Sequence, residues 1–111
     1  MNLKKLINGK SKVCDMAQLK PWQTGLTYEV YVSPEVPKHQ PRMKVIVRGK
    51  DNTVSFLIKD NPEISVGKAH LLSGKEKKEV IDWIILNKDI LLNYWNRRIS
   101  TEELKNNIKK I

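Results

Sequence analysis

The amino-acid sequence predicts an α+β fold: a small antiparallel sheet of three to four strands packed on one long helix, with a short C-terminal helix. Two observations predict it. Alternating apolar and polar residues fill the first part of the chain, whereas helical periodicity and two capping motifs fill the rest. A chain of 111 residues has room for one core. We expect a basic N-terminal arm or short helix over residues 1–25 and a single α+β domain over residues 26–111.

The strands are predicted by alternation. Residues 26–33 place apolar side chains at every second position and form the first expected strand. Three prolines fall within residues 34–41, which therefore form a loop. Residues 42–48 and 53–58 alternate again around a glycine-containing turn and are expected to pair as a hairpin. Residues 64–69 form a weaker fourth candidate.

Capping motifs at their N-termini predict the two helices. Ser73 and Glu76 form a capping box, in which each side chain accepts a backbone amide of the other residue, and a long helix follows to about Arg98. Ser100 and Glu103 repeat the motif before a short last helix. The apolar residues of that helix share one face: Leu104, Ile108 and Ile111.

The inward-facing positions of the strands and of the long helix predict one shared core. Its members are expected to be buried together: Val30, Val45, Val47, Phe56, Ile84, Leu91 and Trp95.

Composition excludes several classes of protein. The single cysteine, Cys14, excludes an intrachain disulfide framework and a cysteine-based zinc site. No apolar run approaches the about 18 residues of a membrane-spanning helix. The lysine-containing start lacks the apolar segment of a secretion signal, so we expect a cytoplasmic protein. No cofactor or metal is expected, because the two histidines, His39 and His70, lack ligand spacing.

The excess of positive charge points to a polyanionic partner. Lys and Arg number 21 against 12 Asp and Glu, a net charge of +9. Arg42, Lys44 and Arg48 fall on one face of the second expected strand. Basic side chains beside an exposed aromatic residue are typical of a surface that binds single-stranded nucleic acid. The neighbouring candidates are Lys38, His39, Lys50 and Tyr31.

A bland interpretation stays open beside this one. A sheet commonly has one solvated face that carries lysine. The chain has 17 lysines and 4 arginines, a bias typical of AT-rich coding sequences. In this interpretation the positive charge reflects the composition of the coding sequence and has no binding role. His39 is either a catalytic residue or a histidine exposed to solvent in a loop with no catalytic role.

Several stretches resemble the bacterial domain-of-unknown-function 4160 family over about residues 26–111. They are the strand at 28–32, the segment Pro41-Arg42-Met43-Lys44-Val45, the helix at 83–95 with its two tryptophans, and the C-terminal Ile-Lys-Lys-Ile. The resemblance implies a bacterial or mobile-element origin and a fold of strands followed by a helix. Members of the family often occur in gene pairs that look like toxin–antitoxin modules.

The chain departs from that family where the family carries histidine. Arg42 and Lys44 replace its His-x-His pair, and Asn87 replaces the histidine between the tryptophans. If those histidines bind a metal or transfer protons, this chain has lost that role.

Together these observations predict a small, non-enzymatic bacterial or phage protein that works through its basic strand face. It would bind RNA or DNA, or an acidic or nucleic-acid-binding protein, as a toxin–antitoxin component or an anti-CRISPR-like inhibitor does. The alternative is a small nuclease or other hydrolase that uses His39. The missing histidine pair favours the binding protein.

Overall fold

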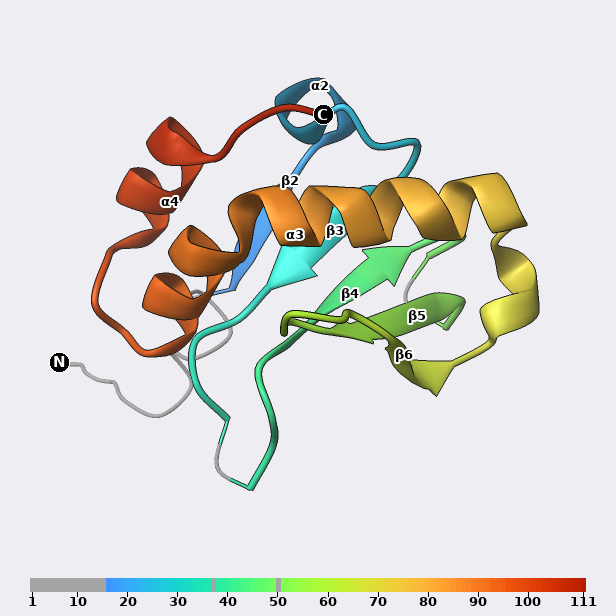
Figure 1. Cartoon of the computed structure of the whole chain (residues 1–111), viewed down its shortest axis with the longest axis horizontal. Helices are drawn as coiled ribbons and strands as arrows, with labels where there is room; N and C mark the ends of the chain where they lie inside the picture. Colours follow the sequence, from blue (N-terminus) through green and yellow to red (C-terminus); the bar gives the residue numbers. More distant parts are fainter. Residues whose placement is uncertain (1–15, 37, 50) are drawn as a thin grey trace, which may run out of the picture.

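One antiparallel sheet forms the centre of the computed structural model, which describes residues 16–36, 38–49 and 51–111 (Figure 1). Strands adjacent in sequence are adjacent in the sheet. Its order is β2 (Ala17–Leu19), β3 (Glu29–Val32), β4 (Arg42–Ile46), β5 (Thr53–Leu57) and β6 (Ile64–Gly67).

Helix α3 (Gly74–Trp95) crosses one face of this sheet, and α4 (Thr101–Asn107) lies beside its C-terminal half (Figure 1). A one-turn helix, α2 (Pro21–Thr24), follows β2, and a 3₁₀ turn, η1 (Ala69–Leu71), precedes α3. The predicted α+β class is confirmed. Among the described residues, no helix is long and apolar enough to cross a membrane.

The sheet has five strands rather than the expected three to four. The additional strand is β2, which lies within the stretch predicted to be an arm outside the domain. Its pairing with β3 places Ala17 opposite Val32 and Leu19 opposite Val30, and all four side chains are fully buried. Three residues are too few to show alternation, so only the pairing identifies this strand. Residues 1–15 of the predicted arm, Cys14 among them, lie outside the described residues.

The core lies between the sheet and α3, as the alternation predicted. Of the seven expected core residues, all except Val47 are buried; Val47 lies just past the end of β4 and is only partly covered. The apolar residues of α3 are not all covered, since Ile85 is 52% exposed. Trp83 is fully buried instead, because α4 and the C-terminal segment cover a second side of α3.

The last helix ends earlier than expected. It stops at Asn107, and Ile108 is extended, so Ile111 does not share a helical face with Leu104. The amide of Asn87 holds the backbone of Lys109 from both sides: Lys109 N donates to Oδ1 at 2.7 Å, and Nδ2 donates to the Lys109 carbonyl at 3.0 Å. Trp83 Nε1 donates to the same carbonyl at 3.0 Å. These side chains hold the backbone of the tail in an extended conformation, so α4 does not continue through it.

Both predicted capping boxes are present. Ser73 Oγ accepts a hydrogen bond from the Glu76 amide at 3.1 Å, and Ser100 Oγ accepts one from the Glu103 amide at 3.1 Å. In return, the backbone amide of each serine donates to the carboxylate of its glutamate at 2.9 Å.

We expect Ser73→Ala and Ser100→Ala each to lower the free energy of unfolding by about 1 kcal/mol, because each leaves one helix-terminal amide without its acceptor. Urea denaturation would measure the change. Ser65→Ala is the control, since Ser65 is exposed in β6 and caps no helix. A loss at Ser73 no larger than at Ser65 would contradict the capping role.

Candidate nucleic-acid interface

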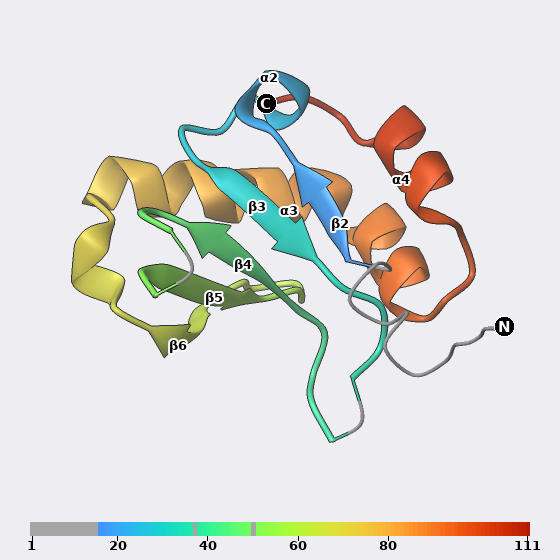
Figure 2. The same cartoon turned by 180° about the vertical axis from the view of Figure 1, so that it is seen from behind.

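The face of the sheet opposite α3 is covered by none of the described helices. Figure 2 shows the sheet from this side, with α3 behind it. Side chains that alternate with the core residues point out of this surface, which we call the outer face. One row of register partners runs across all five strands: Gln18, Tyr31, Lys44, Ser55 and Val66.

The structure places Tyr31 beside Lys44. The two residues are direct partners in the β3–β4 ladder, where opposite Cβ atoms lie about 5 Å apart. Lys44 is exposed and Tyr31 is half-buried, between the fully buried Val30 and Val32. An aromatic ring and a cation thus adjoin near the middle of the outer face, although Tyr31 is half-buried rather than exposed as the sequence predicted.

Arg42 and Arg48 have different positions relative to this pair. Arg42 is two residues from Lys44 in β4 and shares its face. Arg48 lies beyond the end of β4, and its guanidinium lowers the pKa of Tyr28, which burial and a hydrogen bond with Glu76 raise overall. Because β4 ends at Ile46 and Tyr31 pairs with Lys44, Arg48 is at the end of the sheet rather than beside Tyr31. None of the ion pairs among the described residues neutralises these three cations.

The remaining predicted residues lie at the ends of β4. Lys38 and His39 are exposed in the loop before Arg42, where Lys38 has a left-handed backbone with φ of 68°. Lys50 lies outside the described residues. The His39 side chain makes none of the described hydrogen bonds, and within the described part of the chain no three His, Cys, Asp or Glu side chains are grouped as metal ligands would be.

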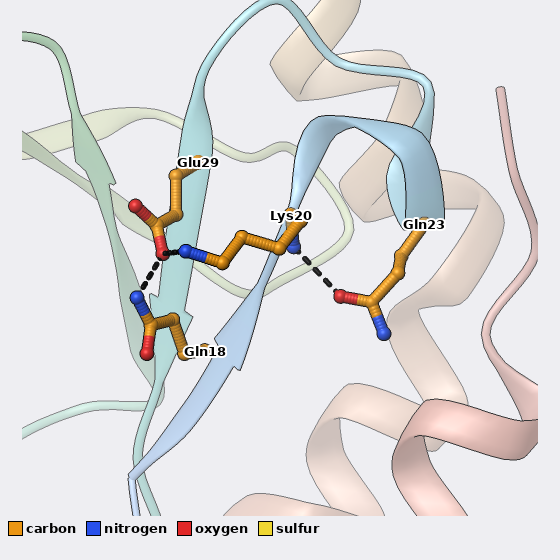
Figure 3. A network of polar contacts seen from close by, with 4 residues as sticks. All are labelled: Gln18, Lys20, Gln23 and Glu29. Carbon is orange, nitrogen blue, oxygen red and sulfur yellow. Dashed lines mark hydrogen bonds and ion pairs between the residues drawn. The ribbon is translucent and has the colours of Figure 1, made fainter.

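Sequence reasoning missed a polar network at the β2–β3 edge of the outer face (Figure 3). Glu29 Oε2 accepts a hydrogen bond from Gln18 Nε2 and pairs with Lys20 Nζ at 3.0 Å. Lys20 also donates its backbone amide to Gln23 at 2.8 Å. Burial raises the pKa of Glu29, but the bonds from Lys20 and Gln18 outweigh it and hold that pKa below its ordinary value. Only the pairing of β2 brings these residues together.

The other edge of the outer face is uncharged, and its polar residue Ser55 is almost fully buried. Val66 is 59% exposed on β6, and Leu57 and Ile46 are partly exposed on the neighbouring strands. Charge on this face is therefore concentrated on β4, between a neutralised β2–β3 side and an uncharged β5–β6 side.

No family model, no curated protein and no solved structure matches the chain. The resemblance to the domain-of-unknown-function 4160 family thus stays a prediction. The candidate site rests on the geometry of the outer face alone.

Proposed function

We propose that this protein binds single-stranded nucleic acid through the outer face of its sheet. The observation that carries the proposal is the pairing of Tyr31 with Lys44 on a face that none of the described helices covers, with Arg42 beside them. A base stacks on the Tyr31 ring while Lys44 and Arg42 contact the phosphates. The toxin–antitoxin and anti-CRISPR-like contexts are biological settings in which such binding is used.

Two features of the face support this proposal over simple solvation. The cations of β4 have no described carboxylate partner, although Glu29 lies on the adjoining strand and is engaged by Lys20 instead. An aromatic side chain on an open face is also a stacking surface for any base, because every base has a π face. His39 gains no described partner that would make it a catalytic base, so nothing in the site favours the hydrolase.

The proposal predicts salt-dependent binding that the β4 cations control. Each phosphate contact on a single strand contributes a slope of about −0.7 in log K against log salt, so the contacts of Lys44 and Arg42 give about −1.4 and a third contact at Arg48, at the end of the sheet, brings it to about −2. We expect the triple variant Arg42→Gln, Lys44→Gln, Arg48→Gln to lose most of that slope. Fluorescence anisotropy with a labelled thymidine dodecamer, titrated at several salt concentrations, measures it.

A control variant removes the same charge elsewhere. Lys105→Gln, Lys109→Gln, Lys110→Gln changes three exposed lysines of α4 and the tail and should leave the slope unchanged. Equal losses in the two triple variants would mean that only net charge matters and would contradict the proposed site.

A second arm separates nucleic acid from an acidic protein partner. Tyr31→Ala should weaken the dodecamer about tenfold, within the 1–3 kcal/mol range of base stacking, and leave binding to a polyglutamate peptide unchanged. Tyr31→Phe, which keeps the ring, should bind the dodecamer normally. Polyglutamate binding with no dodecamer binding would identify the face as a protein-binding surface.

A further inference from the structure

The outer face is electrostatically asymmetric about Tyr31. On its β4 side stand Lys44 and Arg42, whose charges no described carboxylate neutralises. On its β2 side stands Gln18, and along its own strand stands Glu29. Lys20 pairs with Glu29, so the β2–β3 side carries no net charge, whereas the two β4 cations are not neutralised. A bound strand therefore places its phosphates over β4 and its bases over β3 and β2. The base that stacks on Tyr31 therefore has its edge near Glu29.

The Glu29 carboxylate has one oxygen committed and one available. Oε2 accepts from both Gln18 and Lys20, whereas none of the described hydrogen bonds or ion pairs reaches Oε1. Figure 3 shows that oxygen pointing away from both partners. The side chain is 23% exposed, so it is held by its two bonds and still reachable from the outer face. A positioned, ionised carboxylate oxygen can only accept hydrogen bonds.

We infer that Glu29 reads the base that stacks on Tyr31 and selects guanine. This inference rests on the proposed function and adds a sequence preference to it. An acceptor-only group favours a base edge that presents donors side by side. Guanine alone does so, through N1–H and the N2 amino group. Adenine, cytosine and uracil or thymine each place an acceptor beside their donor, which the carboxylate repels.

The test uses dodecamers in which guanine alternates with thymine, compared by anisotropy with dodecamers that carry hypoxanthine or 7-deazaguanine in place of guanine. Hypoxanthine lacks the N2 amino group, whereas 7-deazaguanine keeps the whole Watson–Crick edge and cannot form quadruplexes. We expect the hypoxanthine strand to bind about tenfold more weakly than guanine, because it loses the hydrogen bond from the N2 amino group to the charged Oε1. The 7-deazaguanine strand should bind as guanine does.

The variant Glu29→Gln should reduce that tenfold preference to less than about twofold, since the amide offers one acceptor and two donors. Its affinity for a thymidine dodecamer should be unchanged or higher, because a negative charge is removed from the face. Glu102→Gln removes the same charge from exposed α4 and should keep the preference. Urea denaturation of Glu29→Gln shows whether the variant is folded.

The outcomes separate the two proposals. Binding that needs Tyr31 and Lys44 but does not distinguish guanine from hypoxanthine overturns the role of Glu29 and leaves the proposed function intact. A preference that survives Glu29→Gln also overturns it. Absence of any binding that depends on Tyr31 and Lys44 overturns both.

Discussion

Trp83→Ala is expected to lower the free energy of unfolding by about 3–5 kcal/mol. The indole of Trp83 is fully buried between α3 and the segment that follows α4. Its removal leaves a cavity that the sheet, α4 and the tail can refill only in part. It also removes the donor to the Lys109 carbonyl. Urea denaturation followed by circular dichroism measures the loss.

Trp22→Ala is the matched control, because it makes the same chemical change at a residue that is 72% exposed in α2. We expect a change of no more than about 0.5 kcal/mol there. Similar losses in both variants would show that the Trp83 environment described here is wrong.

Asn87→Ala is expected to lower the free energy of unfolding by about 2–4 kcal/mol, although the side chain removed is small. Asn87 is almost fully buried, and its amide serves both backbone groups of Lys109 as well as the Trp83 carbonyl. Alanine leaves the partly buried backbone amide of Lys109 without its hydrogen-bond acceptor. A buried donor without an acceptor costs about 1–3 kcal/mol. The same denaturation experiment measures it.

Asn106→Ala is the control, since Asn106 is exposed in α4 and its side chain makes none of the described hydrogen bonds. It should change the free energy of unfolding by no more than about half a kcal/mol. Because Trp83 and Asn87 both donate to the Lys109 carbonyl, the double variant should lose less than the sum of the single losses. Strict additivity would contradict a shared anchor for the tail.

The central part of the candidate site was predictable from strand alternation. Residues two apart in a strand share a face, so Arg42 and Lys44 had to emerge together, and Tyr31 had to oppose the apolar side of its own strand. The register that makes Tyr31 and Lys44 neighbours depends on the length and path of the proline-rich loop, which no local pattern reports. Arg48 follows the same alternation, yet the chain leaves the ladder after Ile46 and moves it to the sheet end.

The sequence by itself determined the α+β class, the starts of both C-terminal helices and the core faces of three strands, because capping and alternation are local rules. Only the tertiary structure decided the rest. Strand β2 exists because β3 offers it a ladder, and that pairing alone assembles the Glu29 network. The tail leaves the helical path because Asn87, 22 residues earlier, captures the Lys109 backbone. Both features depend on partners distant in sequence, which a reading of neighbouring residues does not reveal.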